Sequence, residues 1–176
     1  MPDESATEHP RDVVADEHEV PVEGDHVERL LIELFERHWA ELTVGPLIEG
    51  AAYEIRFTSP PKLSMLDGYL TVDTGAWHFH LCVNDPRAAP TAERARLGRV
   101  ARAAFFTESG GTCVPMTWGL RLWNGHGEQM ITVLFPTPYF DDEWRPLAEP
   151  RWEKTARWED FRRRYALAAE GSAPAS

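Results

Sequence analysis

The chain has 176 residues, a length typical of one domain, and 43% of them are hydrophobic, which is enough for a sizeable core. The formal net charge of −11 argues against nucleic acid as the default partner. No apolar run reaches the length of a membrane-spanning helix, and an acidic beginning without a signal sequence predicts a cytoplasmic protein. Two cysteines exclude a disulfide framework.

Acidic residues dominate the beginning of the sequence. Residues 1–25 hold nine acidic residues against Arg11 alone, so most of the net charge lies there. Low hydrophobicity and high charge predict that this segment is a disordered arm. The folded domain is predicted over residues 26–169, and residues 170–176 are predicted to form a short disordered tail.

Three segments show the three- and four-residue spacing of apolar side chains that is typical of amphipathic helices. They cover about residues 26–42, 91–107 and 152–168. Asp25 is a suitable N-cap for the first helix, and Glu28 three residues later completes a capping-box pattern.

Five strands are predicted between these helices, at about residues 51–58, 66–73, 77–83, 117–123 and 128–135. The dipeptides Thr74-Gly75 and Asn124-Gly125 are typical of tight turns and predict two hairpins. The order α-β-β-β-α-β-β-α predicts a single α+β domain with a curved, mostly antiparallel sheet and helices on its apolar face.

Alternation along these strands gives one plainly apolar face and one of unusual composition. The unusual face is expected to carry Glu54, Arg56, Thr58, Tyr69, Thr71, His78, His80, Cys82, Gly119, Arg121, Trp123, Glu128, Met130 and Thr132. Cys, Met and Trp are poor choices for open water, so we expect this face to be partly covered. It lines either a small-molecule pocket or an interface between two copies in a homodimer, and the two can coexist.

The segment His78-Phe79-His80 places two imidazoles on one face of a strand, about 6.5–7 Å apart. Two such groups can converge on one metal ion, with Glu128 or His126 from the next hairpin as the third ligand. Two His and a carboxylate are typical of non-haem iron and of catalytic zinc, so a divalent transition metal, Fe or Zn, is the predicted cofactor. Alternatively, the imidazoles form hydrogen bonds in a polar pocket or act as a general base.

Arg121 and Glu128 are expected to face each other across the second hairpin. They form a cross-strand ion pair, or the planar Arg121 guanidinium binds a carboxylate or phosphate of the substrate through two hydrogen bonds. The predicted catalytic residues are His78, His80, Arg121 and Glu128. The predicted substrate-binding residues are Arg56, Tyr69, Trp123 and Met130.

The strand HFHLC and the hairpin WGLRLWNGHGEQM resemble sequences of an uncharacterised bacterial family, a domain of unknown function. The resemblance extends over about residues 77–158. It implies a cytoplasmic bacterial protein and supplies no activity.

The residues themselves favour a small-molecule enzyme that uses His78 and His80 with a bound metal. Two other classes stay open: a non-catalytic protein that binds a small molecule or cofactor, and a regulatory protein that forms oligomers through the unusual face. The expected partner is a small molecule, with no nucleic acid and no membrane.

Overall fold

Two larger antiparallel sheets and three α-helices make up most of this computed structural model, which describes residues 13–48, 50–109 and 114–168. In chain order the elements are β1 (Val13–Val20), α1 (His26–Arg37), the 3-10 turn η1 (Trp39–Glu41), β2 (Thr43–Gly45), β3 (Leu47–Ile48), β4 (Ala51–Ala52), β5 (Ile55–Arg56), β6 (Lys62–Leu66), β7 (Tyr69–Asp73), β8 (His78–Cys82), α2 (Ala92–Gly98), β9 (Val100–Ser109), β10 (Met116–Asn124), β11 (Gln129–Leu134), the 3-10 turn η2 (Trp152–Thr155) and α3 (Ala156–Tyr165).

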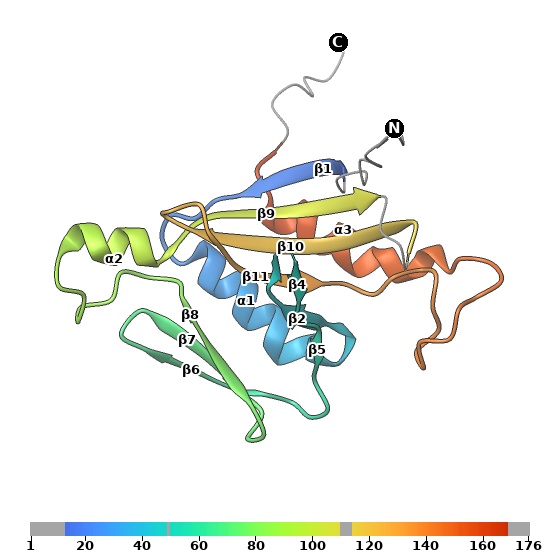
Figure 1. The fold of residues 1–176 in the computed structure, drawn as a ribbon, viewed down its shortest axis with the longest axis horizontal. Helices are drawn as coiled ribbons and strands as arrows, with labels where there is room; N and C mark the ends of the chain where they lie inside the picture. Colours follow the sequence, from blue (N-terminus) through green and yellow to red (C-terminus); the bar gives the residue numbers. More distant parts are fainter. Residues whose placement is uncertain (1–12, 49, 110–113, 169–176) are drawn as a thin grey trace, which may run out of the picture.

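The larger sheet has six strands in the order β1-β9-β10-β11-β2-β5, and the smaller has three in the order β6-β7-β8 (Figure 1). Every pair of neighbouring strands in both sheets is antiparallel. The predicted α+β class with antiparallel strands is therefore confirmed. The single sheet of the prediction is wrong: β6, β7 and β8 pair among themselves in the smaller sheet, and β3 and β4 form a separate two-stranded sheet.

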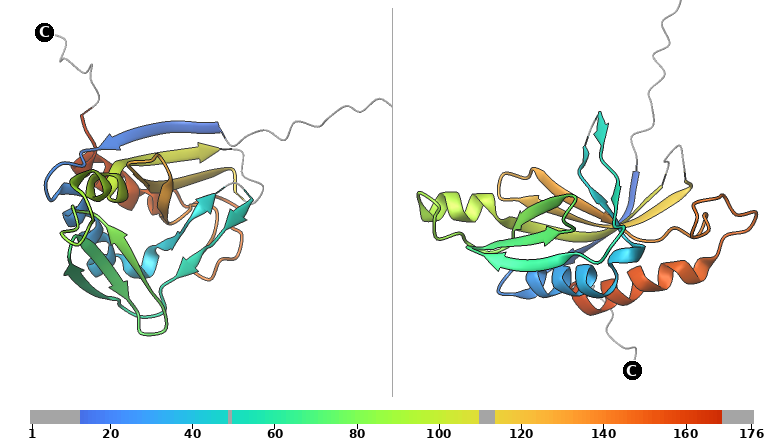
Figure 2. Two further views of the ribbon diagram at one scale, coloured as in Figure 1. Left: turned by 60° about the vertical axis from the view of Figure 1, so that its left-hand side comes forward. Right: turned by 90° about the horizontal axis from the view of Figure 1, so that it is seen from below.

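Helices α1 and α3 cover one face of the six-stranded sheet, and the β3–β4 hairpin projects from the opposite side (Figure 2). The buried residues of α1 recur at helical spacing: Val27, Leu30, Leu31, Leu34 and Phe35. Trp158 and Phe161 of α3 are also buried, and the Trp158 indole donates a hydrogen bond to the Gly119 carbonyl at 2.9 Å. In the described ranges, no helix has both the length and the apolar character that crossing a membrane requires.

The three-stranded sheet turns its apolar face toward the same core. Leu70, Val72 and Leu81 are buried there, and the Phe79 ring lies 5.8 Å from the Phe35 ring of α1. Period-two alternation then places the neighbouring residues of β7 and β8 on the outer face of this sheet. The packing of Phe79 and Leu81 thereby fixes the side on which His78 and His80 emerge.

Both predicted hairpin turns are present. Gly75 between β7 and β8 has a φ of 83°, a conformation that glycine adopts without a steric penalty. In the turn after β10, the Asn124 amide donates to the Glu128 carbonyl at 3.0 Å, and Gly127 rather than Gly125 has a positive φ.

The helix predicted at residues 91–107 is wrong in its second half. Helix α2 ends at Gly98, and residues 100–109 form β9, which pairs with β1 on one side and with β10 on the other. Ala103, Ala104, Phe105 and Phe106 are all buried, so this strand is covered on both faces and lacks the alternation of a half-exposed strand. Its alanines and arginines have high helix propensity, which the two-sided strand pairing overrides.

The disordered arm predicted at residues 1–25 is also wrong where the structure describes it. Residues 13–20 form β1, an edge strand in register with β9 from Val20 opposite Ala103 to Val13 opposite Ser109. The domain therefore begins earlier than the predicted residue 26. Residues 1–12 and the predicted tail at 170–176 lie outside the described residues.

Smaller corrections concern the ends of elements. The strand predicted at 51–58 is two short strands, β4 and β5, and β6 was not predicted. The capping box fails because Asp25 makes no side-chain cap and the Glu28 carboxylate instead accepts a hydrogen bond from the Asn84 amide at 2.6 Å.

Candidate functional site

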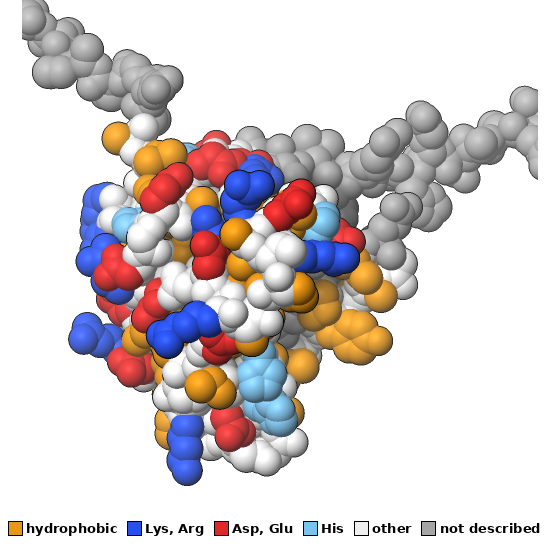
Figure 3. Space-filling model, turned by 90° about the vertical axis from the view of Figure 1, so that its left-hand side faces the viewer, with side chains coloured by type: hydrophobic (Ala, Val, Ile, Leu, Met, Phe, Trp, Pro, Cys, Tyr) orange, Lys and Arg blue, Asp and Glu red, His pale blue; other side chains and the backbone are white. Residues whose placement is uncertain are grey.

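Two imidazoles lie side by side on the outer face of the three-stranded sheet. His78 and His80 are both exposed, and their ring centroids are 5.1 Å apart. Figure 3 shows imidazole side chains gathered on the molecular surface, with apolar side chains beside them. The two residues therefore share one face, as strand alternation predicts, but the partial cover expected for this face is wrong at these two residues, since both are exposed.

A hydrogen bond to a neighbouring strand fixes one of the two imidazoles. Thr71 lies directly opposite His80 in the β7–β8 register, and its Oγ1 is 2.8 Å from His80 Nδ1. This contact occupies Nδ1 and leaves Nε2 facing outward. Asp73 lies opposite His78, but its carboxylate accepts a hydrogen bond from the Gly75 amide at 2.7 Å.

The end of this face away from His78 is apolar. Tyr69, opposite Cys82 and Leu66, is partly exposed, and Leu66 is 75% exposed. Burial raises the pKa of the Cys82 thiol, and the proximity of Cys82 raises the pKa of Tyr69. At neutral pH Cys82 is therefore a protonated thiol, which is a poor metal ligand and a poor nucleophile.

The predicted metal site, in which Glu128 or His126 joins His78 and His80 as the third ligand, is not assembled. Within residues 13–48, 50–109 and 114–168, no three His, Cys, Asp or Glu side chains form a group that can hold a metal ion. Glu128 and His126 belong to the turn between β10 and β11. There the Glu128 carboxylate accepts a hydrogen bond from the side-chain amide of Asn124 at 2.9 Å. That turn packs on the end of α2, since the Gly125 amide donates to the Leu97 carbonyl at 2.9 Å.

The predicted partner of Arg121 is also wrong. Arg121 pairs with Glu108 of β9 at 2.9 Å, and the two side chains are only 14% and 21% exposed. The guanidinium carbon lies 4.3 Å from the centroid of the Phe106 ring. Arg121 therefore lies on the larger sheet, and Glu108 balances its charge. The prediction that Arg121 faces Glu128 is wrong.

The predicted substrate-binding residues are dispersed in the same way. Arg56 stacks on Trp144 with 3.5 Å between the guanidinium carbon and the ring centroid, and Trp123 is covered by Arg102 at 4.1 Å. Met130 packs against the main core. Tyr69 alone of the four shares the face of the two imidazoles.

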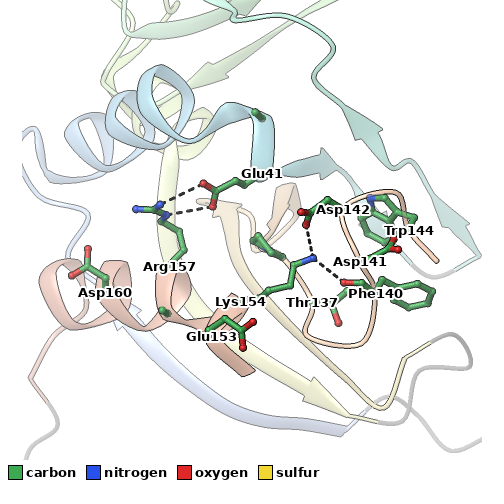
Figure 4. Close-up of a pocket in the computed structure, with 13 residues that line it drawn as sticks. Glu41, Thr137, Phe140, Asp141, Asp142, Trp144, Glu153, Lys154, Arg157 and Asp160 are labelled. Carbon is green, nitrogen blue, oxygen red and sulfur yellow. Dashed lines mark hydrogen bonds and ion pairs between the residues drawn. The ribbon is translucent and has the colours of Figure 1, made fainter. Parts of the chain in front are cut away.

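A cavity lies elsewhere, between η1, α3 and the segment that follows β11 (Figure 4). Its volume is about 580 Å³. Lys154 donates to the Phe140 carbonyl at 2.8 Å and to Asp142 at 3.0 Å, and Arg157 faces Glu41 at 3.4 Å (Figure 4). Lys154 and Arg157 at the cavity are thus each paired with an acidic group, and none of the described residues that line it is a histidine.

Sequence reasoning missed the role of Thr71, Glu108 and Lys154. Thr71 was placed on the correct face, but its bond to His80 depends on which residues lie opposite each other across the hairpin. The turn Thr74-Gly75 carries that signal, because a tight turn fixes the register of the strands on either side. Glu108 follows the helix predicted at residues 91–107 and lies in no predicted strand. The sequence therefore contained no signal for the ion pair between Glu108 and Arg121.

The solved structures with a similar fold include the following three. Two are structures of ChuX, with TM-scores of 0.57 and 0.53 and sequence identities of 12% and 14%, and one of these is described as a heme-binding protein. Both similarities cover 85% of this chain and 77% of ChuX. The third is protein AGR_C_4470 from Agrobacterium tumefaciens, with a TM-score of 0.52, 14% identity, and coverage of 85% of this chain and 71% of that one.

The sequence comparisons agree with the resemblance carried by the strand HFHLC and the hairpin after it. No curated protein matches the chain. Residues 4–167 match the profile described as a family of unknown function (DUF7676), which is nearly the whole sequence. The chain therefore belongs to the family of unknown function DUF7676.

Proposed function

We propose that this protein binds haem without chemically transforming it, on the face of the three-stranded sheet that carries His78 and His80. The observation that carries the proposal is the pair of exposed imidazoles without a third protein ligand among the described side chains. A bare iron or zinc ion needs three or four protein ligands. Haem iron already has four porphyrin nitrogens and needs only one or two axial ligands, for which imidazole is suitable.

The surroundings of the imidazoles also fit a large, mostly apolar ring. Leu66 and Tyr69 lie opposite each other and are both exposed on the same face. Exposed apolar side chains in a cluster are typical of a binding surface. The described heme-binding activity of ChuX, whose fold is similar, supports the same ligand class.

The same observations make an enzyme the weaker interpretation. The predicted catalytic set requires Arg121 and Glu128 beside the imidazoles, and both lie elsewhere with other partners. Haem binding requires only the two imidazoles and the exposed side chains of Leu66 and Tyr69 on the same face. The non-catalytic alternative of the sequence analysis is therefore the function that we propose.

Haem titration tests the proposal. We expect ferric haem to bind to the wild-type protein at micromolar concentration, with a red-shifted Soret band that marks imidazole ligation. The double variant His78→Ala/His80→Ala should lose the shift, and His126→Ala, which removes an exposed imidazole from the distant turn, should keep it. Equal spectra for the wild type and the double variant would reject the site, and absence of binding would reject the function.

A further inference from the structure

We infer that Thr71 is a positioning residue for His80, and that His80 rather than His78 supplies the axial nitrogen to the iron. This inference rests on the proposed haem site. Thr71 Oγ1 is 2.8 Å from His80 Nδ1, so the hydroxyl is placed to accept the Nδ1 proton. An imidazole that donates from Nδ1 presents the lone pair of Nε2 outward, where a ligand can be bound.

The position of the Thr71 hydroxyl is well defined. Thr71 lies on β7, the central strand of the three, between Ser64 of β6 and His80 of β8. Its β-branched side chain has few rotamers on a strand, so the oxygen is held in place by the sheet rather than by the contact alone. Directly opposite residues have Cβ atoms about 4.5–5.5 Å apart, which matches the reach of a threonine hydroxyl to an imidazole nitrogen.

His78 lacks an equivalent partner among the described residues. The carboxylate across from it, Asp73, accepts a hydrogen bond from the Gly75 amide and closes the turn between β7 and β8. Metal-ligating imidazoles in proteins nearly always donate their other N–H to an oxygen, which orients the ring and makes the ligating nitrogen more basic. Of the two imidazoles, His80 is therefore the one prepared for ligation, and His78 flanks it.

The first test requires no haem. Long-range ¹⁵N–¹H correlation spectra of the haem-free protein report which ring nitrogen of each histidine carries the proton. We expect His80 to carry it on Nδ1 in the wild type and in Thr71→Ser, and to shift toward Nε2 protonation in Thr71→Val. Ser64→Ala, on the other side of Thr71, is the matched control and should leave His80 unchanged. A His80 that is protonated on Nε2 in the wild type would overturn the inference.

The second test measures the bound state. Loss of an outer hydrogen-bond partner typically weakens metal binding by about 10–100-fold, so Thr71→Val should lower haem affinity on that order and lower the Fe–His stretching frequency of the ferrous complex. Thr71→Ser should restore both. His80→Ala should abolish axial ligation, and His78→Ala should preserve it.

Three further outcomes have different consequences for the inference and for the proposed function. Equal affinity and equal Fe–His frequency in Thr71→Val and Thr71→Ser would overturn the positioning role and leave the haem site intact. Ligation that persists in His80→Ala and is lost in His78→Ala would likewise overturn the assignment alone. A wild-type protein that fails to bind haem would overturn the proposed function, and with it the role of Thr71.

Discussion

Gly119 is the residue at which the outer face of the larger sheet accommodates an aromatic ring. A Cβ at this position would lie 2.3 Å from Cε1 and 2.4 Å from Cζ of Phe106, which is buried. The Gly119 carbonyl meanwhile accepts the Trp158 indole hydrogen bond from the opposite face. Phe106 thus leaves no room for a side chain at Gly119, and the Trp158 hydrogen bond restrains its backbone.

We expect Gly119→Ala to lower the free energy of unfolding by about 1–3 kcal/mol, because the added methyl group overpacks a filled site. Urea denaturation followed by tryptophan fluorescence measures the change. Gly98→Ala is the control: a Cβ there meets nothing within 4 Å, so that variant should be as stable as the wild type. Equal stability of the two variants would show that Phe106 moves freely.

Glu33 joins the first helix to the last. Its carboxylate accepts hydrogen bonds from Arg164 at 2.9 Å and from the Tyr165 hydroxyl at 2.6 Å. The Arg164 hydrogen bond holds the pKa of Glu33 below its ordinary value of 4.5. Since the pKa is lower in the folded protein than in the unfolded chain, the stabilisation is present above pH 4.5 and is lost as the pH falls through the folded value.

Glu33→Gln should therefore lower the free energy of unfolding by about 1–2 kcal/mol at pH 7, at the low end for a hydrogen bond to a charged group because the pair is partly exposed. The difference from the wild type should shrink as the pH falls below 4.5. Urea unfolding at pH 7, 5 and 3 checks this. Glu36→Gln, an exposed position on the same helix, should show neither effect. A Glu33→Gln deficit that is constant with pH would contradict the linkage.

The face on which His78 and His80 lie was predictable from the sequence, but the ion-pair partner of Arg121 was not. Alternation alone places His78 and His80 on one face, because the period of a strand is fixed by its geometry. The ion pair of Arg121 with Glu108 depends instead on which strand lies beside β10 and in which register. The neighbouring strand and its register are determined by the packing of many core residues. Neither Arg121 nor Glu108 alone indicates them.

At the scale of elements, hairpins and amphipathic helices were predictable because their signals are local. β7, β8, β10 and β11 agree with the predicted strands to within a few residues, and α1 begins at His26 as expected. β9 and β1 were not predictable, since β9 is covered on both faces and β1 is acidic and stabilised by a strand distant in the sequence. Tertiary context decides such segments against their local propensity.

Strand β1 has a directly testable contribution to stability. We expect deletion of residues 1–20 to lower the melting temperature by roughly 10 °C or more, because it removes the β1–β9 pairing and exposes the edge of β9. Deletion of residues 1–12 leaves β1 intact and is the matched control, for which we expect little change. Circular dichroism melting measures both. Equal melting temperatures for the two deletions would show that β1 contributes little.

At the scale of the whole molecule, the sequence predicted the class of fold but a single sheet. Division into two sheets follows from the chain between β5 and β6, where strand pairing with the larger sheet ends and a separate three-stranded sheet begins. This division separates the imidazole pair from Arg121, Trp123 and Met130. The predicted site was therefore too large, because it combined two faces that the fold keeps apart.

Haem binding should stabilise the entire domain by mass action. At a free haem concentration of 100 times Kd the gain is about 2.7 kcal/mol, which corresponds to a rise of about 5–10 °C in melting temperature for a domain of this size. Differential scanning fluorimetry with and without haem measures the shift. The double variant His78→Ala/His80→Ala should show none. An equal shift in that variant would mean that haem stabilises the protein from another surface.

The placement of β1 at the edge of the larger sheet also bears on biosynthesis. β1 pairs with a strand that begins at Val100, so during translation at roughly 5–20 residues per second it waits on the order of ten seconds for its partner. An unpaired strand on a ribosome-bound chain invites pairing with its neighbours on the same polysome, and acidic side chains oppose such contact. Glu17 and Glu19 carry that repulsive charge until Arg102 arrives on β9 and binds both carboxylates. Glu17 and Glu19 thus oppose pairing of β1 with other chains before β9 is made, and they bind β1 to β9 through Arg102 afterwards.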